Sequence, residues 1–308
     1  MPTTTNNFDI TELADIAVGA LAQKLDFLPA FNTGIETDRN KGDFAKVFVH
    51  SKNPETGRDW DETSNNYGTD GGGYTIEGVN VELSEHIYDN AVFSQDELNR
   101  IDLGKVATGL AHNVARRFQI RLYNNLFIDS VFATNVSVGA ADSFTHDNLA
   151  DLCVLADDTG LLEDNRFAIM YNTYFANMKK DGVLVANRNQ NSDPQTVESR
   201  FELINGFDVV SSSIMKSASS LSGEDTIGVI TDGTGVGIAM GSVQFTGDGT
   251  GVAEYATAID PKTGIPISIR KVYDQFTGKW AINAEILMGY KALDTSSTIL
   301  LKSTEPTP

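Results

Sequence analysis

The amino-terminal part of the chain carries hydrophobic residues at every third or fourth position, the pattern of a helix with one buried face. Thr11 can cap this helix, and Pro29 ends the segment. The pattern therefore predicts a short amphipathic helix, an N-terminal arm. Its apolar positions are Leu13, Ile16, Ala17, Ala20, Leu21 and Leu25.

A second, longer helical pattern runs from Ser94 to about Asp129 without a proline, and Asp96 and Glu97 stand in its first turn. At about 1.5 Å per residue, one uninterrupted helix over this stretch would measure roughly 50 Å. We expect it to be the rigid girder of the fold. Its apolar stripe consists of Leu103, Ala107, Leu110, Val114, Phe118 and Leu122.

Alternating apolar positions predict two strands, over residues 44–50 and 74–83. The polar stretch 51–73 between them is far longer than the median connection of about 4–6 residues in a compact domain. Such a loop is either a surface insertion or a segment that reaches another molecule. Trp60 and Tyr67 favour a reaching loop.

Helical and strand patterns alternate in the middle of the chain and predict an α/β lobe, while hairpins follow from Ile265 onward. No stretch has the composition of a linker, so the fold class predicted is α+β throughout. The predicted helices cover residues 147–158 and 173–182, the latter closed by Gly182, and the predicted strands cover 166–171, 207–213, 226–231, 280–290 and 298–302, with a turn at 274–279.

At 308 residues the chain exceeds the roughly 250–300 residues that one core supports, so we expect one large domain or two lobes. A formal net charge of −19 argues against nucleic-acid binding through a broad basic surface. Arg116, Arg117 and Arg121 lie in the C-terminal half of the long helix, where cations suit the helix dipole. A DNA-facing role stays open for them, but a solvated face or ion pairs are favoured.

The single cysteine, Cys153, excludes an internal disulfide and a cysteine-rich zinc site, and its apolar surroundings favour a core position. The first residues have neither the basic nor the apolar segment of a signal peptide, and no apolar run is long enough for a membrane span. We therefore expect synthesis in the cytoplasm and no membrane partner.

The glycine-rich stretch DGTGVGIAMG, residues 232–241, follows an apolar run as a phosphate-binding loop would. It fails the dinucleotide pattern because Met240 stands where the third glycine belongs, and too few residues follow for the required helix. The pentapeptide DGTGV recurs at residues 248–252, which favours a turn in both places. The sequence predicts no cofactor site here.

The rest of the sequence contains no recognisable metal-binding or catalytic motif either. The four histidines are far apart, the acidic pairs Asp157–Asp158 and Glu163–Asp164 lack EF-hand spacing, and no serine stands in a nucleophile-elbow motif. The sequence thus predicts no catalytic, cofactor or metal site, and a protein that is not an enzyme.

The order of the predicted elements resembles the major capsid protein of tailed double-stranded DNA bacteriophages, the Hong Kong 97-like fold. Four stretches are similar to family segments: RFAIMYNTYFANMKKDG, INGFDVVSSSIM, GVITDGTGVGIAMG and KWAINAEILMGYKALD. In the family the long polar loop lies over a neighbouring subunit and the long helix is the spine of a peripheral domain. The resemblance implies that GVITDGTGVGIAMG is a strand followed, after a tight reversal, by a brief Ala/Gly-rich helix in the axial domain.

The resemblance implies five parts, covering residues 1–40 (N-terminal arm), 41–90 (extended loop hairpin), 91–150 (peripheral domain with the spine helix), 151–258 (axial domain) and 259–308 (closing strands shared with the peripheral domain). It also implies contacts between subunits through the loop residues Trp60 and Tyr67 and the helix residues Arg116, Arg117 and Arg121.

The implied function is self-assembly, as pentamers and hexamers, into the icosahedral shell of a virion that encloses double-stranded DNA without sequence-specific binding. The implied partners are a portal protein and a separate scaffolding protein, since only a short segment precedes the loop, and decoration proteins stay open. An encapsulin-like nanocompartment shell is the first alternative. A soluble α/β nucleotide-dependent enzyme is a distant second.

Overall fold

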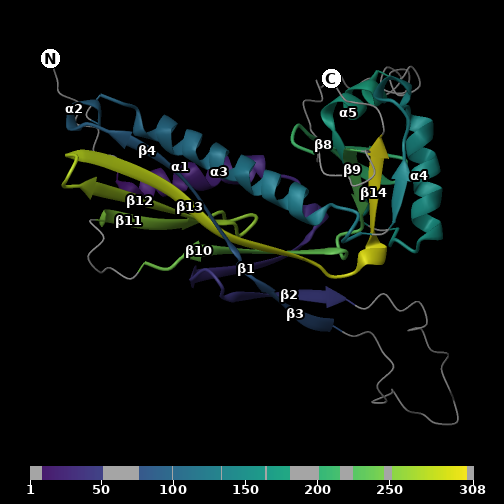
Figure 1. Cartoon of the computed structure of the whole chain (residues 1–308), viewed down its shortest axis with the longest axis horizontal. Coiled ribbons are helices and arrows are strands. Elements are labelled where there is room, and N and C mark those ends of the chain that lie inside the picture. Colours follow the sequence, from purple (N-terminus) through teal and green to yellow (C-terminus); the bar gives the residue numbers. More distant parts are fainter. Residues whose placement is uncertain are drawn as a thin grey trace, which may run out of the picture.

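The computed structural model describes residues 9–50, 76–98, 100–132, 134–163, 165–180, 201–215, 225–245 and 252–303. The chain forms an elongated molecule with a large sheet at one end and a smaller lobe at the other (Figure 1). The helices are α1 (Ile10–Lys24), α2 (Gln95–Leu98), α3 (Leu103–Leu126), α4 (His146–Asp158) and α5 (Asn172–Lys179), with 3-10 turns at Leu28–Ala30, Ala141–Ser143 and Thr295–Ser297.

The large sheet has the strand order β1-β10-β13-β12-β11, and β4 pairs with the other side of β13. β1 runs parallel to β10, while the other pairs are antiparallel. β13 therefore holds the sheet together, because it pairs with β10, β12 and β4. The bounds are β1 (Asn32–Arg39), β4 (Glu85–Phe93), β10 (Val236–Val243), β11 (Val252–Ile259), β12 (Pro266–Asp274) and β13 (Lys279–Ala292).

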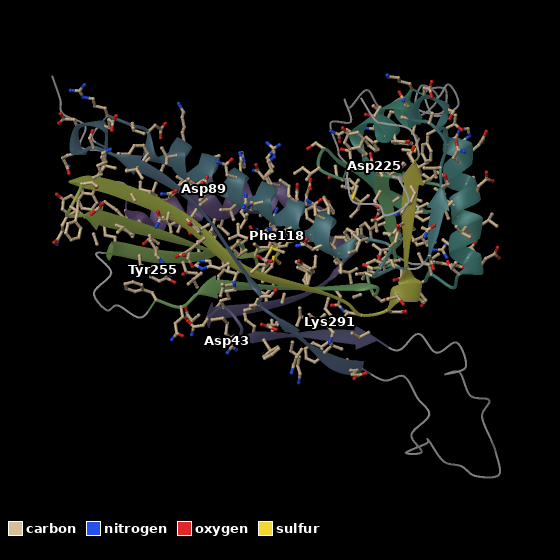
Figure 2. All side chains as sticks on the ribbon, viewed as in Figure 1. Asp43, Asp89, Phe118, Asp225, Tyr255 and Lys291 are labelled. Atoms are coloured by element: carbon tan, nitrogen blue, oxygen red, sulfur yellow. The ribbon has the colours of Figure 1, made fainter. Side chains whose placement is uncertain are left out.

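The helices α1 and α3 cover one face of this sheet, as Figure 1 shows. The predicted apolar stripes of both helices are the residues that pack there, and Phe118 of α3 is fully buried against the sheet (Figure 2). Alternate residues of β13, including Ile282 and Ile286, complete this core from below. Each Å² of apolar surface that this packing removes from water contributes about 25 cal/mol of favourable free energy, and this burial holds the helices on the sheet.

The structure corrects both predicted helix starts. Asp9, not Thr11, caps α1, because its carboxylate accepts a hydrogen bond from the Thr11 amide. The long helix begins at Leu103 rather than Ser94, since the Asp102 carboxylate accepts from the amides of Gly104 and Lys105. Ser94 instead caps the short α2. The predicted 50 Å girder is therefore an α3 of about 36 Å.

The smaller lobe contains a second sheet in the order β5-β14-β9-β6-β8-β7. One face of it packs against α4 and α5, and the other face meets the core beneath α3 through residues such as Ile169 and Val229. The predicted helices and strands of this region are confirmed within one to three residues; Gly182 lies outside the described residues. The bounds are β5 (Asn135–Ser137), β6 (Phe167–Tyr171), β7 (Phe201–Ile204), β8 (Phe207–Ser212), β9 (Asp225–Thr231) and β14 (Thr298–Ser303).

A two-stranded ribbon of β2 (Phe44–His50) and β3 (Ile76–Glu82) lies on the face of the large sheet opposite α3. Its buried side consists of Ala45, Val47, Val81 and the adjacent Leu83, which pack on β10 and β13. Both strands were predicted. The polar stretch 51–73 that joins them, including the expected reaching segment, lies outside the described residues.

The brief helix predicted after the strand in GVITDGTGVGIAMG is wrong. Residues 237–241 are the central part of β10, which pairs with β1 and β13 in the large sheet. Gly233 does make a turn, with φ +82, and Gly235 and Gly237 allow close packing because a Cβ there would run into Thr298 and Leu293 respectively. The change from the second sheet to the large sheet thus falls between β9 and β10, and β14 returns to the second sheet.

Gly289 of β13 is the position where the ribbon crosses the sheet most closely, because an added Cβ would overlap the Glu82 carbonyl oxygen. We expect Gly289→Ala to lower the free energy of unfolding by about 1–3 kcal/mol, since backbone must shift to accommodate the methyl group. Gly109→Ala is the matched control. It lies on the exposed side of α3 with nothing within 4 Å of the new Cβ, so a gain of up to about 1 kcal/mol is expected. Urea denaturation followed by circular dichroism measures both, and equal effects would contradict the packing argument.

Candidate assembly surfaces

The outward side of the β2–β3 ribbon is apolar although it faces solvent. Phe44, Phe48 and Ile76 are 55%, 54% and 58% exposed. They alternate along the strands with the buried Ala45 and Val47, so the ribbon has two apolar faces and the sheet covers only one of them. We call these three residues the ribbon patch. An apolar patch that the chain itself leaves uncovered marks a surface suited to a partner.

Lys46 lies in the middle of the ribbon patch. Its side chain crosses Gly78, where a Cβ would meet the Lys46 chain at 2.7 Å, and its ammonium stands 6.0 Å from the centre of the Phe48 ring. The aliphatic part of Lys46 therefore extends the apolar surface, while its charge remains in solvent.

The exposed side of α3 is the second unusual surface, because this helix contains no Asp or Glu in a chain of net charge −19. Arg116 and Arg117 are exposed and Arg121 is partly buried. None of the three forms an ion pair with any residue that the structure describes. Of the two interpretations favoured for these arginines, the described residues therefore agree with a solvated face and not with ion pairs.

The three predicted arginines do not form one cluster. Arg117 and Arg121 line a hollow of about 410 Å³ along the edge strand β4. Within it, the Asn113 amide donates a 2.7 Å hydrogen bond to the Asp89 carboxylate, and Figure 2 shows Asp89 beside α3. Arg116 instead lines a second cavity, on the side of α3 that faces the smaller lobe.

The large sheet also has an open face beside the ribbon. The Glu285 carboxylate is 5% exposed and pairs with Arg270 and, at 2.9 Å, with the His86 ring. Tyr88 and Val92 on β4 are 65% and 51% exposed on this same face. Because the outer edge of β4 has no strand beside it in the described chain, this part of the sheet is also available to a neighbouring molecule.

The exposed side of α4, in the smaller lobe, carries negative charge. Asp147, Asp151 and Asp158 are exposed along α4, around the 61% exposed Val154. The Arg166 guanidinium is almost fully buried and bonds the Asp157 carboxylate at 2.6 Å, so it adds no free positive charge there. One subunit thus carries an acid-free helix surface in the larger part and an acidic helix surface in the smaller lobe.

Of the predicted contact residues, Trp60 and Tyr67 lie outside the described residues. The ribbon patch was missed by the sequence reasoning, although the signal was present. With Ala45 and Val47 assigned to the inner face of a strand, Phe44 and Phe48 must stand on the outer face.

Within the described ranges, no group of three or more His, Cys, Asp or Glu side chains is arranged to hold a metal ion. Cys153 is a free thiol, partly buried against the core of the smaller lobe, as expected from its apolar surroundings. None of the described helices is long and apolar enough to cross a membrane.

By sequence, the chain matches no protein-family model and no curated protein. Its structure is similar to that of the capsid of Ralstonia phage GP4, with a TM-score of 0.53 at 10% identity over 91% of this chain and 88% of that one. It is also similar to the capsid of cyanophage P-SCSP1u, with a TM-score of 0.51 at 12% identity over 89% and 87% of the chains. A third similar structure is the virus-like particle from Pyrococcus furiosus, with a TM-score of 0.53 at 9% identity over 94% and 97%. The protein therefore has the α+β fold of phage capsid subunits, the Hong Kong 97-like fold.

Proposed function

We propose that this chain is the major capsid protein of a tailed double-stranded DNA bacteriophage. Copies would assemble as pentamers and hexamers into the icosahedral shell that encloses the genome. The observation that carries the proposal is the fold likeness, which extends over about nine-tenths of this chain and of each phage capsid subunit.

The surfaces of the subunit support this proposal. A shell subunit needs large contacts with its neighbours, and obligate interfaces bury about 2,000–5,000 Å². The ribbon patch supplies exposed aromatic groups, which dominate the energetics of such contacts. The acid-free side of α3 and the acidic side of α4 are complementary in charge between copies, which favours association of like subunits despite the net charge of −19.

Specific residues are proposed for these contacts. The ribbon patch and the loop residues Trp60 and Tyr67 would lie on a neighbouring subunit. Arg117 and Arg121 line the hollow beside the edge strand β4, and there they would meet acidic groups of a neighbour. Arg116 faces the other cavity.

The remaining partners follow from the proposed role. A portal protein and a separate scaffolding protein would act in assembly, decoration proteins could bind the outside, and the enclosed DNA would be held without sequence-specific recognition. The mature location would be the virion, after synthesis in the cytoplasm of the bacterial host. No catalytic activity is proposed, because the fold likeness is to structural shell subunits.

The second candidate is an encapsulin-like nanocompartment shell, which the likeness to the virus-like particle from Pyrococcus furiosus supports. The contents of purified particles distinguish the two. A phage capsid encloses DNA, whereas a nanocompartment encloses a cargo protein. A gene for a cargo enzyme next to this one, in place of portal and terminase genes, would also favour the second candidate.

Electron microscopy of the overexpressed chain tests self-assembly. We expect rings or closed polyhedral particles, and these should become more frequent at higher salt, because screening reduces repulsion between subunits of charge −19. A chain that stays monomeric at all salt concentrations, with and without co-expressed scaffolding protein, would refute the proposal. Stabilisation of such a monomer by a nucleotide would instead favour the soluble-enzyme interpretation.

A further inference from the structure

The cavity that Arg116 lines lies between the two parts of the molecule, and we call it the interlobe cavity. It has a volume of about 480 Å³. One wall comes from α3 and the end of α1, with Arg116 and Lys24, and the other from the smaller lobe, with Asn172 of α5 and the serines that end β8. A ligand in this space would touch both lobes at once.

The first wall carries positive charge. The side chains of Lys24 and Arg116 form no ion pair in the described ranges. Burial, together with the nearby Lys24 ammonium, lowers the pKa of His112, so this ring is neutral near neutral pH. Asp26 also lines the cavity, and with one acid against two bases the wall remains positive at neutral pH.

The second wall supplies hydrogen-bond donors. Ser211, Ser212 and Ser213, at the end of β8, line this wall. The amino end of α5, at Asn172, has no side-chain cap, so the positive end of the helix dipole is open to the cavity. Tyr123 completes the floor, and burial raises the pKa of its hydroxyl, which keeps it a neutral donor.

We propose that the interlobe cavity is a binding site for an oxyanion of the phosphate class. Two cations, the serines at the end of β8 and an uncapped helix end line one space from two sides, and a tetrahedral anion has enough acceptor oxygens to satisfy donors from both. Inorganic phosphate and the terminal phosphate of a polynucleotide share this chemistry. The site does not depend on the proposed shell function.

Occupation of the site would couple the two lobes. A ligand that binds only the folded chain stabilises it in proportion to the logarithm of its concentration. Because this ligand bridges α3 and α5, it would also restrict the movement of one lobe against the other.

Titration of the purified full-length chain with inorganic phosphate tests the proposal, with ionic strength held constant by chloride. We expect saturable heat in calorimetry and a rise in Tm with phosphate concentration. Arg116→Gln is expected to weaken binding about tenfold or more, since a charge-assisted hydrogen bond contributes about 1.5–3 kcal/mol. Replacing Ser211 and Ser213 together by alanine removes polar groups from the second wall and should also weaken phosphate binding.

Lys105→Gln is the matched control, because it removes the same charge from the same helix outside the cavity, where Lys105 is 87% exposed. It should leave phosphate binding unchanged. Absence of saturable binding to the wild-type chain, or equal losses in Lys105→Gln and Arg116→Gln, would overturn the proposal. Circular dichroism confirms that each variant is folded, and electron microscopy of particles tests shell assembly independently.

A short oligonucleotide with a 5′-phosphate, compared with the same strand ending in a 5′-hydroxyl, distinguishes the sources of the anion. If the terminal phosphate is the natural ligand, only the phosphorylated strand competes with inorganic phosphate. If free phosphate is the ligand, neither strand competes. Equal competition by both strands, reduced alike by Lys105→Gln and Arg116→Gln, would mean general attraction to α3 and would refute a defined site.

Discussion

Replacing both Phe44 and Phe48 by serine is expected to abolish closed particles while leaving the subunit folded. Both rings are more than half exposed in the subunit, so their loss should change the free energy of unfolding by no more than about 0.5 kcal/mol each. In an assembly the same rings would be buried. Truncation of a buried aromatic anchor typically costs 2 kcal/mol or more of binding free energy, and each subunit of a shell repeats the loss.

Particle yield by electron microscopy and sedimentation measures this effect, and circular dichroism checks the fold. Asn80→Ser is the matched control. It lies on the same side of the same ribbon, opposite Lys46, but it removes no apolar surface. Particles of normal size and number from the double serine variant would show that the ribbon patch takes no part in assembly.

Asp129→Ala is expected to lower the free energy of unfolding by about 3 kcal/mol. Lys302, in β14 of the smaller lobe, is 2% exposed and pairs with the Asp129 carboxylate just beyond the end of α3. Removal of one partner of a buried ion pair leaves the other charge buried without compensation, which typically costs about 3–5 kcal/mol. The lower end applies here because Asp129 is 29% exposed and the vacated space can admit water.

A double-mutant cycle with Lys302→Met separates the pair from its surroundings. Lys302→Met alone should cost much less than Asp129→Ala, because the Asp129 carboxylate left behind reaches solvent. The two changes together should therefore restore most of the stability lost in Asp129→Ala. Urea denaturation measures all four proteins. Additive losses would mean that the ion pair does not connect the two lobes energetically.

Several of the elements that the sequence predicted have one buried face, although β4, which also has one, was not predicted. For α1 and α3, burial of a single side produces a period of three to four residues, and the stripes from Leu13 and Leu103 onward became the core. In β2 the same cause gives a period of two. The N-cap of the long helix was harder to predict. Ser94 and Asp102 are both competent N-caps, and only the path of the chain decides which one starts the long helix.

The strand β1 was missed for a different reason. Its sequence NTGIETDR is polar and only Gly34 within it is buried, so no alternation is visible. Its pairing partner is β10, far away in the sequence, and the parallel ladder rather than the side chains places it in the sheet. The sequence also could not show how the arginines of α3 are distributed. Arg116 and Arg117 are neighbours in sequence but line different hollows, because the smaller lobe and the large sheet contact the helix from different sides.

The sequence alone determined the helices with one buried face, the two strands of the ribbon, the α+β class and the order of elements that resembles a capsid subunit. It also showed that DGTGVGIAMG is not a phosphate loop, because the third glycine is out of register. Only the tertiary structure decided what the stretch is. Every residue of β10 is buried, with Ile238 and Met240 toward the helices and Ala239 toward the ribbon. A strand covered on both faces has no period. Gly235, just before the strand, and Gly237 within it are the places where Thr298 and Leu293 pack against the backbone.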